Sequence, residues 1–409
     1  MRKIILSAAV LTIGMVSCKK ETGMMVTVSN PLLMERLEEM VEVSADDVYK
    51  KLNLTDTSEF IIVDENNLEV PYQITYDGNI IFPASVGAES TSVYKFKLGE
   101  PAPVNTLVYG RHYPERLDDI AWENDKAAYR AYGPALQATG EKAYGYDILT
   151  KSVSELVVED RYARDLDSDA RAKIKELRES GKNEEAQELA DAISYHIDHG
   201  NGMDCYAVGP TLGGGTSALM PDSVIAYPYC YKEYEILDNG PLRFTVKLEY
   251  NPMTIAADTN VVETRIIQLD RGSHLNKATV NYSSVSKDYP VAAGIVLHEA
   301  HPDRYYTDRD NGYVSYADPT TDIKADNGIV YVGLVLPNNM EAAKVQKFEK
   351  PVGGALGHLL GISTYQPGYD FVYYWGSAWS KCGFDDDKWN QYLKEYSLKV
   401  KNPLVVTVK

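Results

Sequence analysis

Cysteine is scarce in this chain, which has four cysteines among 409 residues. No Cys-x-x-Cys pair occurs, so neither a thiolate zinc site nor a dithiol redox site is supported. Once Cys18 is set aside, three cysteines remain: Cys205, Cys230 and Cys382. At most one disulfide can form among three cysteines, and both a Cys205–Cys230 bond and three buried thiols stay open.

Basic residues are also in short supply, with 41 Lys and Arg against 59 Asp and Glu. The formal net charge of -18 argues against a nucleic-acid partner, because phosphate binding needs a basic surface. The glycine triplet Gly213 to Gly215 lacks the Lys-Ser/Thr that completes a phosphate loop, so a tight turn is the better interpretation. The sequence shows no internal repeat and no low-complexity tail.

Residues 1–17 have the pattern of a signal peptide: Arg2 and Lys3, an apolar run, and small Ser17. Cys18 follows at once, which resembles the lipobox of bacterial lipoproteins, where this cysteine is lipidated. We therefore expect an extracytoplasmic protein that contacts the membrane only through a lipid anchor, with residues 18–25 as linker. An ordinary secretory signal is the alternative.

The remaining chain predicts a mostly β protein of two domains. Short β-rich runs separated by turn signals indicate a β-sandwich over 26–103. Residues 104–409 contain many long strand patterns without alternating helices, which favours a large antiparallel sandwich over a doubly wound sheet. One helical hairpin is expected at 166–194, with Ser168 and Asn183 as N-caps. It is either a lid or a surface insertion.

The segment from Tyr109 to Pro134 is unusually dense in ionisable and aromatic groups. Its charged residues interrupt both helical and strand periodicity, so the segment reads as an irregular wall of paired charges. Such a wall is either a salt-bridged structural belt or the lining of a polar cleft. The candidate catalytic residues in this segment are His112 and Glu123. The candidate substrate-binding residues are Arg111, Arg116, Asp119, Trp122, Asn124 and Arg130.

Histidine is also scarce, with seven residues in the chain, so the positions of these residues are informative. Two His-x-x-His spacings occur, in YHIDHGNGMD and in LHEAHPD, and this spacing is a weak metal signal on a strand or loop. In the first, His196, His199 and Asp204 lie beside glycines that allow close approach of a ligand. Proton transfer by His196 or His199 is one interpretation, and a polar turn is the other.

Aromatic residues concentrate near the C-terminus, in YDFVYYWGSAWSKCGFDDDKW. Tyrosine is abundant, with 31 residues against seven phenylalanines. Because Trp and Tyr faces stack on sugars, Tyr374, Trp375 and Trp379 are predicted to bind substrate, whereas Trp389 is expected to be structural.

Three runs carry a resemblance to a known family: PERLDDIAWENDKAAYRAYGP, YHxDHGxGxD and YYWGSAWSK. They resemble the secreted family called domain of unknown function 4861, found in polysaccharide-utilisation gene clusters of Gram-negative bacteria. The resemblance implies a β-supersandwich of galactose-mutarotase or polysaccharide-lyase type that acts on uronic-acid-containing oligosaccharides in the cell envelope. The long helical hairpin before His196 departs from the family pattern.

The leading hypothesis is a lyase or dehydratase that performs β-elimination on a uronate. His196 or His199 would be the base, Arg116 and Arg130 would hold the carboxylate, and Tyr206 or His112 would supply the proton.

Two other hypotheses stay open. One is hydrolysis by two carboxylates drawn from Glu115, Asp119, Glu123 and Asp204. The other is a surface glycan-binding lipoprotein without turnover. No cofactor is certain, although a divalent cation is conceivable, with Asp119, Glu123, His196, His199 and Asp204 as donors.

Overall fold

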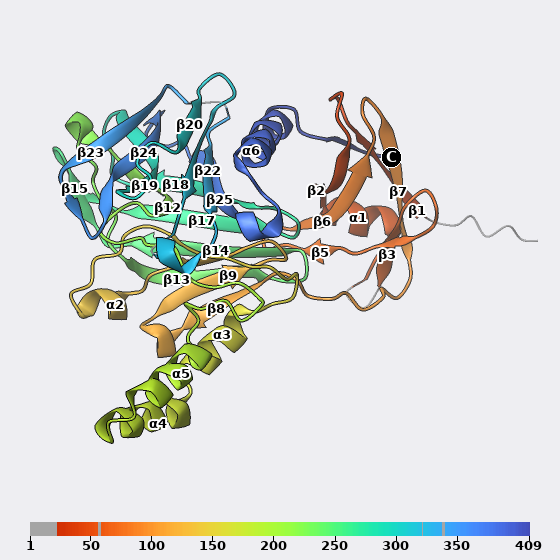
Figure 1. Cartoon of the computed structure of the whole chain (residues 1–409). Coiled ribbons are helices and arrows are strands. Elements are labelled where there is room, and N and C mark those ends of the chain that lie inside the picture. Colours follow the sequence, from red (N-terminus) through yellow and green to blue (C-terminus); the bar gives the residue numbers. More distant parts are fainter. Residues whose placement is uncertain (1–22, 56–58, 321, 338–339) are drawn as a thin grey trace, which may run out of the picture.

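The polypeptide folds into two β-sandwiches of unequal size, and a helical hairpin projects from the larger one (Figure 1). The structure is a computed structural model that describes residues 23–55, 59–320, 322–337 and 340–409. The expected leader and Cys18 therefore lie outside the described residues. None of the helices within these ranges is long and apolar enough to cross a membrane.

The small sandwich consists of two antiparallel sheets and one helix. The first sheet has the order β26 (Val405–Val408), β1 (Gly23–Ser29), β7 (Thr91–Leu98), β3 (Phe60–Val63) and β4 (Glu69–Val70); the second has β2 (Arg36–Ser44), β6 (Asn79–Val86) and β5 (Gln73–Ile74); the helix is α1 (Ala45–Leu52). Alternation buries Met24, Val26 and Val28 of β1 in a core of its own. The last strand of the chain thus completes the first sheet, which the sequence did not predict.

The large sandwich packs a four-stranded sheet against an eight-stranded sheet. The latter has the order β13 (Tyr231–Asn239), β14 (Arg243–Tyr250), β17 (Glu263–Asp270), β18 (Leu275–Tyr282), β25 (Phe371–Trp379), β22 (Val330–Val335), β21 (Tyr313–Asp318) and β20 (Tyr305–Asp308). The former has β12 (Gly214–Leu219), β19 (Tyr289–His298), β24 (Ala355–Tyr365) and β23 (Ala342–Val352), and β15 (Met253–Ile255) pairs with β16 (Asp258–Val261). Along β17 every second residue is buried, as expected for a strand with one face on the core.

A third sheet, of four strands, covers part of the eight-stranded sheet. Its order is β11 (Asp147–Leu149), β10 (Ala128–Ala131), β9 (Asp119–Glu123) and β8 (Tyr109–Tyr113). Trp122 of β9 stacks on Phe244 of β14, with ring centroids 6.0 Å apart, and meets Trp375 of β25 edge to face. These aromatic contacts fix the sheet on the main core.

The helices fall on the outside of these layers. They are α2 (Pro134–Ala138), α3 (Val158–Asp165), α4 (Ser168–Glu179), α5 (Asn183–Ile193) and α6 (Asp386–Lys401), with short 3₁₀ turns η1 (Pro114–Arg116), η2 (Pro221–Ser223), η3 (Ile323–Ala325) and η4 (Ser380–Cys382). The helical hairpin is present as α4 and α5, but its N-caps are Asp167, which accepts from the Ala170 amide, and Lys182. The predicted caps Ser168 and Asn183 are therefore one residue late.

Helix α6 was not predicted, and it covers the outer face of the eight-stranded sheet with Trp389 and Leu393 buried. Trp389 is structural, as expected. Cys205 and Cys230 are buried without a bond between them, so the disulfide considered from the sequence is absent. Cys382 is exposed, so the alternative of three buried thiols holds for two of the three. The predicted fold class, a mostly β chain with a small N-terminal sandwich and a large antiparallel supersandwich, is confirmed.

Candidate functional site

The charged residues of the Tyr109 to Pro134 segment belong to one face of a regular sheet. Ile120 and Trp122 of β9 point into the main core, whereas Asp119 and Glu123 point to the opposite face. Arg130 of β10 lies opposite Ala121 of β9 and Asp147 of β11, so its side chain joins this opposite face. The expected irregular wall is thus an ordinary alternating sheet with a polar outer face.

This polar face is buried because helix α3 packs over it. Val158 and Tyr162 of α3 contact Ala121, Ala128 and Leu149 of the sheet in a small apolar cluster. The charges beside that cluster are consequently removed from water, and burial of this kind is tolerated only when charges are paired.

Arg130 is the centre of a buried ionic cluster. Its guanidinium donates to the carboxylates of Asp147 and Asp204, with a distance of 3.0 Å to Asp204 Oδ2, and lies 3.6 Å from Asp119 Oδ2. The Tyr132 hydroxyl donates to Asp147 Oδ2 at 2.8 Å. We call these five residues the arginine cluster. None of its three aspartate side chains is more than 4% exposed.

The arginine cluster has more negative groups than one guanidinium can neutralise. Burial raises the pKa of Asp119 to about 7, and the charges of Asp147 and Asp204 add to this, while Arg130 and Arg116 oppose it. Burial, with the charge of Asp147, raises the pKa of Asp204 to about 6. The pKa values of both carboxyl groups therefore lie near neutral pH, which is the range that suits acid–base catalysis.

The second polar stretch, residues 195–204, meets the first at this cluster. Asp204 pairs with Leu149 in an isolated antiparallel bridge, which brings its side chain to Arg130. The Tyr195 hydroxyl accepts from Arg130 Nη1 at 3.5 Å and also from Arg116. Segments about seventy positions apart in the sequence thus form one hydrogen-bonded network.

His196 places an imidazole at the surface of this network. Its Nδ1 lies 3.0 Å from the backbone oxygen of Asp204 and 3.8 Å from the Asp204 carboxylate, and 60% of its side chain is exposed. Because a carbonyl oxygen only accepts, Nδ1 carries the proton in the neutral ring. Nε2 is left with a lone pair and a carboxylate behind the ring, as expected of a general base.

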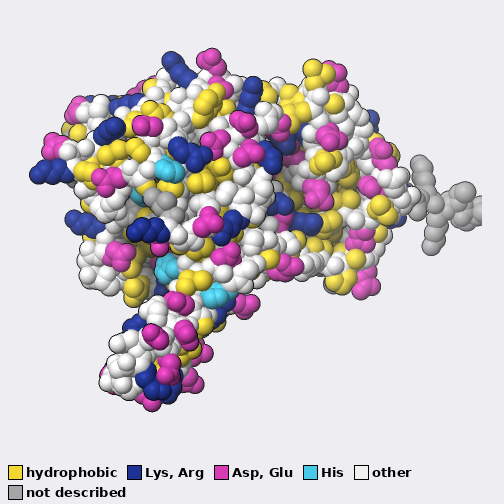
Figure 2. All heavy atoms as spheres, in the orientation of Figure 1, with side chains coloured by type: hydrophobic (Ala, Val, Ile, Leu, Met, Phe, Trp, Pro, Cys, Tyr) yellow, Lys and Arg dark blue, Asp and Glu magenta, His cyan; other side chains and the backbone are white. Residues whose placement is uncertain are grey.

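His199 lies on the same loop and is also exposed. Its Nε2 donates to the Ser194 backbone oxygen at 3.0 Å, while Asp198 Oδ1 accepts from the amides of Gly200 and Gly202 and holds the loop. Histidine side chains are visible on the face at the base of the helical hairpin (Figure 2). His199 has no contact with the arginine cluster within the described part of the chain, so His196 is the stronger candidate.

Glu123, expected to be catalytic, instead anchors helix α3. It forms an ion pair of 2.7 Å with Lys151 Nζ and accepts from the amides of Val157 and Val158 at 2.8 Å. Both carboxylate oxygens are occupied by the protein, so this expectation is corrected. Asn124, expected to bind substrate, donates to the backbone oxygens of Asp270 and Ser273 and is fully buried.

The three tryptophans expected to stack on a sugar are also buried. Trp122 is 0% exposed and donates to Asn276 Oδ1 at 2.8 Å. Trp375 stacks on Tyr146 with centroids 4.1 Å apart, and Trp379 donates to the Asn327 backbone oxygen. Their faces are covered by protein, so this part of the prediction is corrected.

Tyr206 is likewise buried, with its hydroxyl donating to the Gly213 backbone oxygen at 3.2 Å. Its ring lies edge-on to His298, whose Nδ1 is 2.6 Å from Asp318 Oδ2. Burial opposes the charged ring, but the hydrogen bond and charge of Asp318 raise the pKa of His298 overall. The hydroxyl of Tyr206 is buried and already donates to a backbone oxygen, so its expected role as proton donor is not supported.

The remaining predicted residues lie near α3 and β8. Arg111 bonds to Glu159 and Glu115 at 2.8 and 2.6 Å and ties α3 to the sheet rather than facing a ligand. His112 is 3.4 Å from Asp118 Oδ1. Arg116 is 20% exposed and lies 3.5 Å from Asp165, and its Nε has no hydrogen-bond partner.

The metal candidates do not assemble into a site. Across the described ranges, no group of three or more His, Cys, Asp or Glu side chains is arranged to hold a metal ion. The carboxylates of Asp119 and Asp204 are directed at Arg130, and the carboxylate of Glu123 is directed at Lys151. Each of these carboxylates therefore already has a cationic side chain as its partner.

Sequence reasoning missed Asp147, Tyr132 and Tyr195. Asp147 is the first residue of the otherwise apolar strand β11, and a lone carboxylate beside apolar strand residues is a usable signal for a buried ion pair. Tyr132 and Tyr195 carried no signal, because 31 tyrosines are spread through the chain.

Comparison with known proteins gives relatives over nearly the whole chain. "Uncharacterized protein P7" of Formosa agariphila is 25% identical over 420 residues, which is 96% of this chain and 95% of that protein. Among solved structures, a protein in the glycosyl hydrolase family 38 from Enterococcus faecalis has a TM-score of 0.49 at 8% identity, covering 95% of this chain and 48% of that one. An alpha-mannosidase from E. faecalis V583 has a TM-score of 0.47 at 9% identity, covering 95% and 46%.

This chain thus spans about half the length of those two solved proteins. The family model described as "Domain of unknown function (DUF4861)" matches residues 28–406. The protein therefore belongs to the DUF4861 family.

Proposed function

We propose that the protein is a carbohydrate-active enzyme that performs β-elimination on uronic-acid-containing oligosaccharides. One observation carries the proposal: the exposed His196 ring rests on the carboxylate and backbone of Asp204, which belongs to the arginine cluster. A base at the surface with a fixed tautomer and a buried acid behind it fits abstraction of a weakly acidic C–H proton.

In this reaction His196 Nε2 takes the proton from the carbon next to the uronate carboxylate. The electron pair forms a carbon–carbon double bond, and the oxygen substituent on the neighbouring carbon leaves with a proton. Asp204 stabilises the imidazolium that results, because the two groups are 3.8 Å apart. The leaving group is a sugar in a lyase and water in a dehydratase.

The substrate carboxylate must be neutralised for charge to develop on it. The charge of Arg130 is already compensated by three aspartates, so the role passes to Arg116, whose side chain is 20% exposed. The Tyr195 hydroxyl accepts from Arg116 and Arg130 and so helps to orient Arg116. Because Tyr195 is buried, the proton for the leaving oxygen comes from the His196 imidazolium or from water.

The test follows formation of the unsaturated sugar by ultraviolet absorbance with uronate oligosaccharides of defined linkage. His196→Gln is expected to abolish product formation, whereas His199→Gln, on the same exposed loop, keeps it. No product from the wild-type protein with any uronate oligosaccharide, or full activity of His196→Gln, would refute the proposal.

A second candidate, hydrolysis by two carboxylates, is favoured by the raised pKa values of Asp119 and Asp204. Of the carboxylates first considered, Glu123 and Glu115 are held by Lys151 and Arg111. Hydrolysis predicts new reducing ends without an ultraviolet signal. The Asp119→Asn variant should release no reducing ends, although it should still bind the substrate.

We also propose that the protein is lipid-anchored in the Gram-negative cell envelope, facing oligosaccharide rather than nucleic acid. The support is the leader pattern, Cys18 and the net charge of -18. Cys18→Ser should release the protein from membranes and abolish incorporation of labelled fatty acid. Membrane retention of that variant would contradict the anchor.

A further inference from the structure

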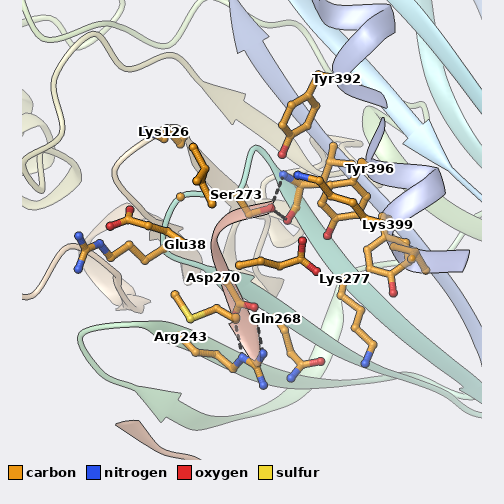
Figure 3. A pocket seen from close by; sticks show the side chains of 18 of the residues that line it. Glu38, Lys126, Arg243, Gln268, Asp270, Ser273, Lys277, Tyr392, Tyr396 and Lys399 are labelled. Atoms are coloured by element: carbon orange, nitrogen blue, oxygen red, sulfur yellow. Dashed lines mark hydrogen bonds and ion pairs between the residues drawn. The ribbon is translucent and has the colours of Figure 1, made fainter. Parts of the chain in front are cut away.

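A cavity separates the small sandwich from the outer face of the eight-stranded sheet, and no residue of the arginine cluster lines it. Its volume is about 460 Å³, within the range of about 300–1,000 Å³ typical of ligand pockets. Strands β14, β17, β18 and β25 form its floor, and β2 and α6 form its walls. Figure 3 shows Tyr392 and Tyr396 of α6 on one side and Arg243 and Gln268 of the sheet on another.

Strand register places a polar row on the floor of this cavity. Gln268 of β17 lies opposite Lys277 of β18, and Lys277 lies opposite Tyr374 of β25. Directly opposed side chains on one face are neighbours, so an amide, an ammonium and a phenol stand side by side. Tyr374 was predicted to bind substrate, and it lines this cavity.

Three of the five cations that line the cavity form no direct ion pair in the described part of the chain. Lys277, Lys399 and Arg271 are half-buried, and none of them forms an ion pair within the described ranges. Three of the five lining carboxylates are paired, Asp270 with Arg243 at 2.6 Å, Asp125 with Lys126 at 3.0 Å and Glu39 with Arg36. Glu38 and Glu395 form no ion pair within the described ranges, so the unpaired cations outnumber the unpaired acids by three to two. Half-buried cations that lack partners favour an anionic ligand.

The walls supply aromatic faces and acceptors. Tyr374 meets Tyr396 edge to face at 5.2 Å, and Tyr392 stacks on Trp389, which fixes the orientation of the rings. A bulge in β2, where Glu38 has a φ of +49°, carries Glu38 to the cavity rim. Tyrosine faces stack on sugar rings, and carboxylates accept hydrogen bonds from sugar hydroxyls.

We propose that this cavity is a binding site for an anionic saccharide, a pyranose that bears a carboxylate or a sulfate. Lys277 and Lys399 bind the anionic group, Tyr374 and Tyr396 pack on the ring, and Gln268 and Glu38 bind hydroxyl groups. The site holds the polymer away from the arginine cluster and does not need turnover there, so it stands independently of the proposed function.

The test is isothermal titration calorimetry with three probes: oligogalacturonate, a sulfated oligosaccharide of neutral sugars, and uncharged maltohexaose. Titrations use the full-length protein and the His196→Gln variant, in which turnover cannot consume the probe. Lys277→Gln and Lys399→Gln remove one charge each. Lys247→Gln is the matched control, since Lys247 is half-buried on the same face of β14 but does not line the cavity.

At least one anionic probe should bind saturably, and its affinity should fall with added salt. Lys277→Gln should weaken binding at least about tenfold, because a charge-assisted hydrogen bond is lost, and Lys247→Gln should leave affinity unchanged. The preferred anionic probe identifies carboxylate or sulfate as the recognised group.

Absence of saturable binding by both anionic probes, or equal affinity in Lys277→Gln and the wild type, overturns the inference. Equal binding of maltohexaose also overturns it. If the wild type forms unsaturated product while Lys277→Gln binds normally, the site fails and the proposed function stands. If the anionic probe binds as expected but the wild type forms no unsaturated product in any assay, the binding site stands and the proposed function fails.

Discussion

Asp119 and Glu123 lie on the same buried face of strand β9, yet their neutral replacements should change stability in opposite directions. Burial has raised the pKa of Asp119 to about 7, which means that its ionised form is poorly tolerated in the folded protein. Asn has nearly the same shape without the charge. We therefore predict that Asp119→Asn stabilises the protein at pH 8.

The magnitude follows from linkage between protonation and folding. The ordinary pKa of 3.8 and the folded value of about 7 differ by about three pH units, each worth about 1.4 kcal/mol, so ionised Asp119 costs at most about 4 kcal/mol above pH 7. Below pH 4 the carboxyl is protonated in both states and the cost vanishes. The favourable effect of Arg130, 3.6 Å away, is already contained in the folded pKa of about 7, and relaxation around the ionised carboxylate lowers the real cost, so a gain of about 2–4 kcal/mol is expected.

Urea unfolding followed by tryptophan fluorescence at pH 4.5, 6 and 8 measures this difference. The gain of Asp119→Asn over the wild type should grow as pH rises through this window. Glu123→Gln is the control, and it should lose about 3–5 kcal/mol at pH 8 because the buried Lys151 ammonium is left without its partner. A less stable Asp119→Asn at pH 8, or a gain that does not vary with pH, would refute the reasoning.

Three further substitutions test the packing around the site. Arg130→Met should destabilise the protein by about 3–5 kcal/mol at pH 8 and by less at pH 5, where Asp119 and Asp204 are protonated; an effect below about 1 kcal/mol at pH 8 in urea unfolding would contradict the arginine cluster. Trp375→Ala should cost about 3–5 kcal/mol through the cavity left beside Tyr146, while acidic-saccharide affinity of the folded fraction stays unchanged; selective loss of that affinity would contradict a structural role. Gly133→Ala should lower the melting temperature markedly, because a Cβ there would lie 1.9 Å from the Asp118 backbone oxygen, and an unchanged melting temperature would argue against this close approach.

The strands were predictable where one sheet face meets a core and the other meets solvent. Strand β17 alternates buried and half-buried residues along its whole length, and its sequence shows the same period from Ile267 to Asp270. The buried positions before Ile267 hold the ion pair of Glu263 and Arg265 instead of apolar residues. Strand β9 has the same period, but its polar face is covered by α3, so every residue is buried. Nothing local in the segment says that a helix forty positions later will cover it.

The site was predictable in outline but not in its pairings. Residue types singled out Arg130, His196 and Asp204, and the structure brings them together. The partner Asp147 depends on the register between β10 and β11, which is a tertiary property. The burial of Trp375 likewise depends on the sheet that packs over it, because a tryptophan suits a core and a sugar platform equally well.

The pairing of β26 with β1 has a practical use. Val408 lies opposite Val26, so the first and last described strands run side by side on the small sandwich, at the other end of the molecule from the hairpin (Figure 1). A sensor chip, bead or fusion partner attached directly before Gly23 or after Lys409 would therefore hold the protein by the same end. Either attachment leaves the His196 surface facing the solution, so immobilised assays need no internal labelling site.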